Sequence, residues 1–189
     1  DSTADPMFVS ADLLSQAEHD KLASAVLVCT DEELASKVQK EIERQLPLLE
    51  REEIARASID NNGKIIITDS IENAIEIANR IAPEHLELCM DNPFDYLDAV
   101  KNAGSIFMGK YCPEALGDYF AGPNHTLPTS GTARFSSPLS VDDFVKKTQY
   151  SYYTAEALKN DGAKIMYFAE KEGLGAHARS VGVRLEEEK

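Results

Sequence analysis

The sequence predicts an α/β fold, with a mainly parallel sheet that carries helices on both faces, followed by a helical C-terminal tail. Short apolar runs with β-branched residues predict the strands, and they alternate with longer segments of helical periodicity. Because parallel strands need long crossover connections, this alternation favours β-α-β units. Helical spacing over most of residues 154–181 predicts the tail. We therefore expect an α/β domain at residues 1–139 and a helical tail at residues 140–189.

The first part of the chain is predicted to contain three helices and two buried strands. Asp5 suits the N-cap of the first helix and Pro6 its first turn. The strands are continuous apolar runs, and Asn61-Asn62-Gly63 predicts a turn before the second of them. Helices are expected at residues 6–17, 31–45 and 51–59, and strands at residues 24–30 and 64–68.

In the middle of the chain, predicted strands and helices continue to alternate, and a long irregular segment follows them. Pro83 ends a helix whose apolar residues share one face, and residues 109–139 are rich in Gly, Pro, Thr and Ser. So long an irregular segment is more typical of a functional loop than of a linker. Helices are expected at residues 70–81, 93–101, 140–147, 154–172 and 172–181, strands at 85–90 and 105–108, and an extended segment at 150–153.

The composition of the chain limits the kinds of molecule that it is expected to bind. The formal net charge of −14 argues against nucleic acid and anionic membrane surfaces, which need a basic footprint. It fits an enzyme for a small polar or cationic substrate, although acidity that only aids solubility is an equal alternative. No apolar run approaches a membrane span, and the three cysteines share no CxxC spacing, so we expect a reducing, cytoplasmic setting. The chain lacks an initiator Met, and we expect it to be a piece of a longer protein.

All four histidines lie within a few residues of a carboxylate, and they are His19, His85, His125 and His177. Histidine binds metals and moves protons near neutral pH. Four such clusters along one chain predict the parts of a single metal-dependent site.

The first two clusters differ in their chemistry. Gln16 and His19 lie three apart near a helix end, where an amide oxygen and an imidazole on one face can bind a divalent cation. A plain surface helix terminus is the alternative. Glu84 and His85 follow Pro83 in a strand-end loop, where they can act as two bases, or as a base and a water activator. Taken alone, a Pro-Glu-His segment is mostly only a turn.

The other two clusters flank glycines. Glu114 and Asp118 would share a helical face ahead of His125 in the Gly/Pro-rich loop, a composition typical of metal sites. Glu172 and His177 are separated by two glycines that predict a bend able to redirect His177. A surface histidine is the simpler interpretation of that last segment.

Four motifs occur in one order over the whole length: LLSQAEHD, APEHLEL, PEALGDYFAGPNHTLPTSGTARFSSPLSV and EGLGAHARSV. With them the chain resembles histidinol dehydrogenase, the enzyme of the last two oxidations of histidine biosynthesis. The resemblance implies a zinc- and NAD-dependent oxidation of L-histidinol to the aldehyde and then to L-histidine. It also implies an incomplete Rossmann-like sheet, because family members are more than twice as long as this chain.

The resemblance implies roles for named residues. Glu84 and His85 would form the acid–base pair of catalysis. Three residues would contact the substrate, namely Glu114, His125 and Glu172. The zinc ligands would be Gln16, His19, Asp118 and His177.

The resemblance also implies a homodimer in which the tail crosses over, so that His177 completes the zinc site of the other subunit. The NAD site would lie mostly in the N-terminal half that this chain lacks, and we expect the isolated part to be inactive. Two alternatives stay open: a non-catalytic, dimerising α/β fragment, and a zinc hydrolase with Glu84 as its base.

Overall fold

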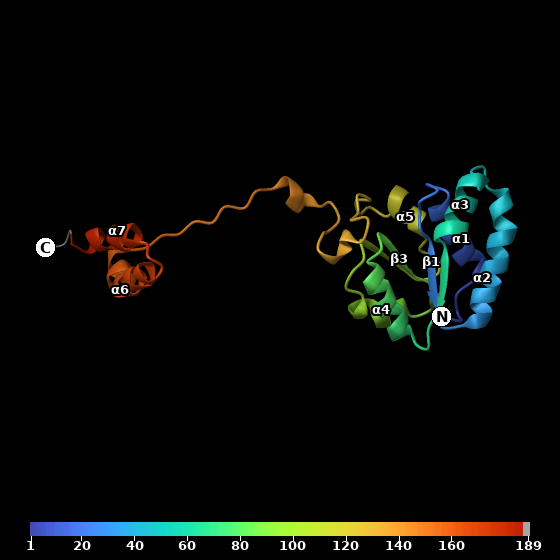
Figure 1. The fold of residues 1–189 in the computed structure, drawn as a ribbon, viewed down its shortest axis with the longest axis horizontal. Helices are drawn as coiled ribbons and strands as arrows, with labels where there is room; N and C mark the ends of the chain where they lie inside the picture. The colour runs from blue at the N-terminus through green and yellow to red at the C-terminus, as the bar shows by residue number, and fades with distance from the viewer. Residues whose placement is uncertain (187–189) are drawn as a thin grey trace. The chain divides into compact units, whose positions relative to one another are not determined.

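Figure 1 shows the computed structural model of the chain, which describes residues 1–186. The chain divides into two compact units, Asp1–Phe144 and Val145–Lys189. The first contains all the strands of the described residues, and the second is helical. The assignment of these parts to a catalytic domain and a dimer-crossing tail stays a prediction.

The strands of the first unit are short and parallel. β1 (Val26–Cys29) pairs with β2 (Lys64–Ile67), and β3 (His85–Leu88) pairs with β4 (Ser105–Met108). The predicted α/β class with parallel pairing is therefore confirmed. One detail is wrong: within the described residues the strands form two two-stranded sheets rather than one sheet. Apolar periodicity marks a strand, whereas the neighbour on each edge is decided by segments far away in the chain.

The helices of the first unit begin where the sequence places caps. The Asp5 carboxylate accepts from the backbone N–H of Met7, and the Asp31 carboxylate accepts from the backbone N–H groups of Glu33 and Leu34. These bonds satisfy N–H groups that a helix leaves unpaired. The helices are α1 (Pro6–Ala17), α2 (Glu32–Gln45), α3 (Glu52–Asn62), α4 (Ile71–Ile81) and α5 (Glu114–Tyr119).

Several expected elements differ in type or extent. The helix expected at residues 93–101 is a 3₁₀ helix, η2 (Pro93–Ala99), and the one expected at 140–147 is a single 3₁₀ turn, η4 (Val141–Phe144). The turn expected at residues 61–63 is shorter, because α3 runs on to Asn62 before Gly63 ends it. Short 3₁₀ helices replace α-helices where a segment lacks the length to nucleate a full helix. Two further 3₁₀ turns are η1 (Leu46–Leu48) and η3 (Thr132–Arg134).

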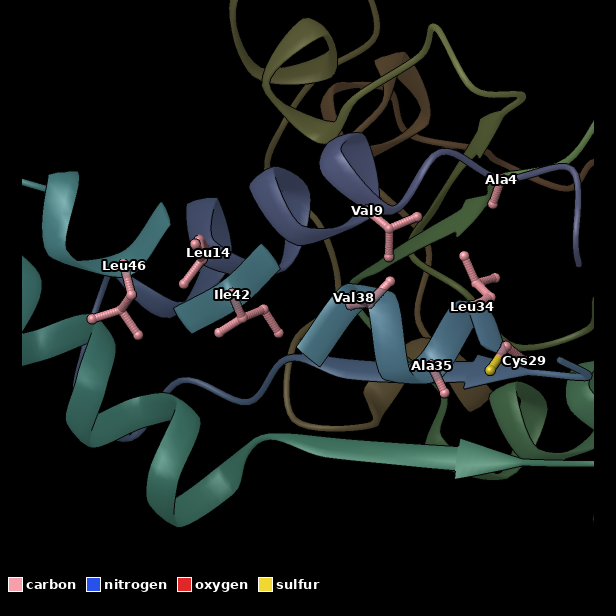
Figure 2. Packing of buried hydrophobic residues seen from close by; sticks show 9 residues of the cluster. All are labelled: Ala4, Val9, Leu14, Cys29, Leu34, Ala35, Val38, Ile42 and Leu46. Atoms are coloured by element: carbon pink, nitrogen blue, oxygen red, sulfur yellow. The ribbon is translucent and has the colours of Figure 1, made fainter. Parts of the chain in front are cut away.

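The main core lies between α1, α2 and β1 (Figure 2). Ser10 of α1 is fully buried beside this core. Its hydroxyl, which has one hydrogen, lies within hydrogen-bonding distance of the carbonyl oxygens of Pro6, at 2.7 Å, and Val38, at 3.1 Å. These bonds fix α1 against α2 and hence the position of the C-terminal end of α1. The core residues are Ala4, Val9, Leu14, Cys29, Leu34, Ala35, Val38, Ile42 and Leu46.

An open cleft of about 630 Å³ lies between the two sheets of the first unit. Residues of both β1 and β3 line it, together with parts of α1 and α4. Each of these strands pairs on one edge only within the described residues, so the other edge borders the cleft. Four of the residues singled out from the sequence line this cleft: Gln16, Glu84, His85 and Glu114.

The second unit is a pair of packed helices, α6 (Ala155–Lys171) and α7 (Gly175–Glu186). Gly162 permits their close contact, because a Cβ there would lie 2.8 Å from Leu185 Cδ1. The bend expected around Gly173 is present, with φ of +76°. The helix expected at residues 172–181 therefore begins three residues later, and residues 150–153 form no regular structure.

No helix among the described residues combines the length and the apolar character that a membrane crossing requires.

Candidate active site and metal centre

Glu84 and His85 are held by the backbone at the start of β3. Ala82 ends α4 in a left-handed conformation, with φ of 52°, and turns the chain toward the cleft. The Gly104 N–H donates to the carbonyl oxygen of Pro83 at 2.9 Å, and the Ser105 N–H donates to that of Glu84 at 2.8 Å. A Cβ on Gly104 would lie 2.6 Å from the Glu84 carbonyl oxygen, so this approach requires glycine.

His85 lies half-buried against the ring of Phe107, with 5.9 Å between the ring centroids. Its Nε2 is 3.7 Å from Oε1 of Glu114. Burial lowers the pKa of His85, although the carboxylates of Glu84 and Asp118 oppose that shift. The imidazole is thus neutral at pH 7 and can accept a proton.

The helix α5 presents Glu114 and Asp118 to the same point. It lies close to β4, since a Cβ on Gly117 would lie 2.6 Å from the ring of Phe107. Glu114 is buried, and one of its carboxyl oxygens lies within 4.8 Å of one of Asp118. Burial, together with Asp118, raises the pKa of Glu114 to about 7. His125 Nδ1 approaches Asp118 Oδ1 to 3.8 Å from the exposed loop.

His85, Glu114 and Asp118 together have the geometry of a cation site. One ligand atom from each lies within 4.8 Å of the others. An imidazole nitrogen with carboxylate oxygens is a donor set that zinc accepts. A cation would also relieve the crowding of acidic groups that raises the pKa of Glu114. The residues therefore fit a zinc ion, although only Asp118 of these three is among the ligands predicted from the sequence.

The C-terminal end of α1 points toward the same place. Gln16 is half-buried and lines the cleft with Glu84 and His85. His19 is exposed just beyond the helix, where its carbonyl oxygen accepts from the guanidinium of Arg51 at 3.2 Å. His19 lies near enough to His85 for its charge to lower the pKa of His85. The structure thus brings Gln16 and His19 into the neighbourhood of Glu84 and His85.

The Gly/Thr-rich loop borders the cleft and is tied to α4. Thr129, Ser130 and Gly131 line the cleft, and the last two have positive φ of 54° and 76°. The guanidinium of Arg134 donates to the carbonyl oxygen of Gly131 at 2.7 Å and to that of Arg80. Arg134 therefore binds the loop to the C-terminal end of α4, close before Glu84.

Glu172 and His177 lie in the second unit. Glu172 caps the C-terminal end of α6, and His177 lies in the first turn of α7. Both side chains are exposed. Their part in the site stays a prediction.

Two acidic residues near the site were given no role from the sequence, although one of them, Glu87, lies within the APEHLEL motif. Asp12 lies on α1 one turn before Gln16, and Glu87 lies on β3 two residues after His85. Burial, together with the charge of Asp12, raises the pKa of Glu87 to about 8. For Glu87 the sequence does give a signal, which is a charged residue between Leu86 and Leu88 of a short strand. Charged residues are rarely buried unless they are paired.

Comparison with known proteins decides the family. The family model described as histidinol dehydrogenase matches residues 1–185. The chain belongs to the histidinol dehydrogenase family. The resemblance drawn from the four motifs is thereby confirmed, and with it the membership of an oxidoreductase family.

Individual histidinol dehydrogenases match almost the whole chain. The one from Bacillus cereus is 60% identical over 189 residues, which are 100% of this chain and 44% of that protein. The one from Clostridium acetobutylicum is 61% identical over 184 residues, which are 97% of this chain and 43% of that protein. The crystal structure of histidinol dehydrogenase from Elizabethkingia anophelis aligns with a TM-score of 0.93 at 43% identity, over 98% of this chain and 43% of that chain. The chain thus spans less than half the length of these relatives.

Proposed function

We propose that this chain supplies the acid–base and metal-binding residues of a zinc- and NAD-dependent dehydrogenase. The complete protein would oxidise L-histidinol to L-histidine by way of the aldehyde, in the cytoplasm. The observation that carries the proposal is the position of His85, next to Glu84 and with Nε2 3.7 Å from Glu114 Oε1, in the lining of an open cleft. An oxidation of this kind needs a general base next to groups that bind the substrate, and residues of the cleft can serve both purposes.

The two oxidations assign different tasks to the two adjacent residues. In the first, His85 Nε2 takes the hydroxyl proton of the alcohol while the carbinol C–H bond breaks. In the second, the Glu84 carboxylate takes a proton from water as the water oxygen bonds to the aldehyde carbon, and the hydrate then loses its C–H hydrogen. When bound, NAD accepts a hydride in each oxidation. A base contributes about 10²–10⁴-fold to such a step.

Substrate binding uses the acidic groups around the base. Histidinol carries an ammonium group at pH 7, which suits the carboxylates of Glu114 and Glu172, while His125 adds a hydrogen-bonding group. Zinc, when bound, anchors an imidazole or amine nitrogen of the substrate without itself being oxidised. It would be held by Gln16, His19, Asp118 and His177.

The proposal places the remaining parts outside this chain. The chain spans 44% of the Bacillus cereus relative, and the residues that bind NAD are expected in the remainder. We further propose a homodimer in which His177 comes from the other subunit. The 189-residue chain alone is therefore expected to be inactive.

The test compares this chain with the full-length protein in an assay of NAD reduction by L-histidinol. The full-length protein should reduce two NAD per histidinol and the 189-residue chain none. If the full-length protein fails to reduce NAD yet still dimerises, the non-catalytic alternative would be supported. Turnover of an ester or amide without a change in dinucleotide absorbance would instead point to a zinc hydrolase.

A further inference from the structure

A buried asparagine lies on α4, shortly before the proposed acid–base pair. Asn79 is 7% exposed, although asparagine is mostly found on protein surfaces. Its Nδ2 donates to the carbonyl oxygen of Ala99 at 2.9 Å. Its Oδ1 accepts from the backbone N–H groups of Lys101, at 2.7 Å, and Asn102, at 3.2 Å. Bonds from one buried side chain therefore fix this backbone segment against α4.

The bonding between the two segments is reciprocal. The Nδ2 of Asn102 donates to the backbone carbonyl oxygen of Asn79 at 3.0 Å. In a continuing helix that carbonyl would accept from residue 83, which is a proline and has no N–H group. Asn102 thus supplies a donor that the end of the helix lacks. We call these two residues the asparagine pair.

The two segments remain bonded to each other as they leave the asparagine pair. The Gly104 N–H donates to the carbonyl oxygen of Pro83 at 2.9 Å. The Ser105 N–H donates to that of Glu84 at 2.8 Å. His85 then lies opposite Ser105 in the parallel register of β3 and β4. Side-chain bonds, backbone bonds and strand pairing thus form one continuous series that ends at the acid–base pair.

This series sets the position of His85. Its imidazole lies against the ring of Phe107, a residue of β4. Helix α5 reaches the same ring at Gly117, where a Cβ would lie 2.6 Å from it. A shift of β3 along β4 would therefore move the imidazole relative to Phe107 and to α5, which carries Glu114 and Asp118. A displacement of about 1 Å at a reacting group can lower a rate about 100-fold.

We propose that Asn79 and Asn102 are positioning residues, which set the register at which Glu84 and His85 enter the site. This inference rests on the proposed function of Glu84 and His85 as the acid–base pair. Among the described residues, the lining of the cleft includes Ala78 of α4 but neither asparagine. The asparagine pair therefore acts through the backbone of the acid–base pair and not by contact with the substrate.

The test uses the full-length protein and compares single variants. Asn79→Leu and Asn102→Leu keep side chains of similar size but lose their side-chain hydrogen bonds. Asn102→Gln retains an amide that can donate to the Asn79 carbonyl oxygen. Asn73→Leu makes the same change at an exposed position of α4 and serves as the matched control.

The kinetic result should be a loss in kcat alone. We expect kcat for histidinol to fall in Asn79→Leu and Asn102→Leu, by up to about 100-fold. KM and zinc content should change little, because none of the proposed zinc ligands lies on α4, β3 or β4. Asn102→Gln and Asn73→Leu should stay within about threefold of the wild-type kcat, far from that loss. The double leucine variant should lose no more than Asn79→Leu, since both residues act through one contact.

Hydrogen exchange, followed by mass spectrometry, gives a readout that does not depend on turnover. The N–H groups of Gly104 and Ser105 should exchange faster in Asn79→Leu than in the wild type and in Asn73→Leu. Those of β1 and β2 should exchange at the wild-type rate in all variants. If Asn79→Leu does not fold, Asn102→Leu takes its place, because it loses only the bond to the Asn79 carbonyl oxygen.

Three outcomes would overturn the inference. They are wild-type exchange at Gly104 and Ser105 in both leucine variants, equal kcat in Asn102→Leu and Asn102→Gln, and a loss of zinc that accounts for the loss of kcat. A wild type that never reduces NAD, although its variants show the expected exchange pattern, would refute the proposed function alone.

Discussion

His85 Nε2 lies 3.7 Å from Glu114 Oε1, and this contact joins two segments that are 29 residues apart in the chain. It places a neutral imidazole beside a carboxyl group whose pKa is raised to about 7. Because the pKa of Glu114 lies near neutral pH, this carboxyl group can give or take a proton under physiological conditions. The contact depends on α5 (Glu114–Tyr119), a short helix within the Gly/Pro-rich segment.

Replacement of His19 by alanine in the full-length protein should sharply lower its zinc content. The imidazole of His19 is one of four proposed ligands, and zinc sites with a missing ligand bind weakly. Metal analysis of the purified variant measures the effect, and Lys21→Ala, which is exposed two residues away, is the control. Unchanged zinc stoichiometry in His19→Ala would remove His19 from the site.

Replacement of Glu84 by glutamine should leave zinc and histidinol binding intact while slowing the second oxidation more than the first. The amide cannot take a proton from water, and a lost base commonly costs about 10²–10⁴ in rate. Separate assays with histidinol and with the aldehyde compare the two steps. Equal slowing of both would argue against activation of water by Glu84.

Gly104→Ala should impair catalysis from a position that is not itself among the proposed site residues. The new Cβ would lie 2.6 Å from the Glu84 carbonyl oxygen, so the Pro83–Glu84 backbone has to move. We expect a loss of about 1–3 kcal/mol in the free energy of unfolding and a lower kcat. Gly182→Ala is the matched control, because its Cβ would meet only the flexible side chain of Met166, at 3.4 Å from Cε and 3.8 Å from Sδ. Wild-type kcat in Gly104→Ala would show that Glu84 and His85 tolerate this displacement.

The acid limb of activity should lie at lower pH than an ordinary histidine would give. Burial lowers the pKa of His85 below its ordinary value of 6.5, so the imidazole stays neutral as the pH falls to that value. It loses its function as a base only on protonation below its own pKa. The pH profile of kcat/KM for histidinol reports this group in the free enzyme. Glu114 has a pKa of about 7 and also bears on substrate binding, so the profile is compared with that of Glu114→Gln. An acid limb with its midpoint above pH 6.5 in Glu114→Gln would contradict the assignment to His85.

Two inactive subunits should restore one zinc site when they are combined. If His177 crosses to the partner, a heterodimer of a His19→Ala subunit and a His177→Ala subunit contains one site with all four ligands and one with neither histidine. The exposed position of His177 on α7 is compatible with a reach to another chain. Zinc content and activity of isolated heterodimers measure the outcome, with each homodimeric variant as control. No recovery of zinc would mean that His177 serves its own subunit.

Much of the secondary structure could be read from the sequence, because its causes are local. The bounds of α1 follow from apolar spacing together with Asp5 and Pro6, all within a few residues of one another. The same holds for β4, whose four residues were expected with their observed bounds. The order of the motifs also identified the family, since it needs no knowledge of which residues meet.

The sequence by itself determined the strands, most helices and the acidic clusters beside the histidines. Only the tertiary structure decided that the strands form two separate parallel pairs and that His85, Glu114 and Asp118 meet. It also placed Asp12 and Glu87 in the lining of the same cleft. The physical reason is range: caps and periodicity act over a few residues, whereas strand pairing, burial and shifts of pKa arise between segments brought together by folding.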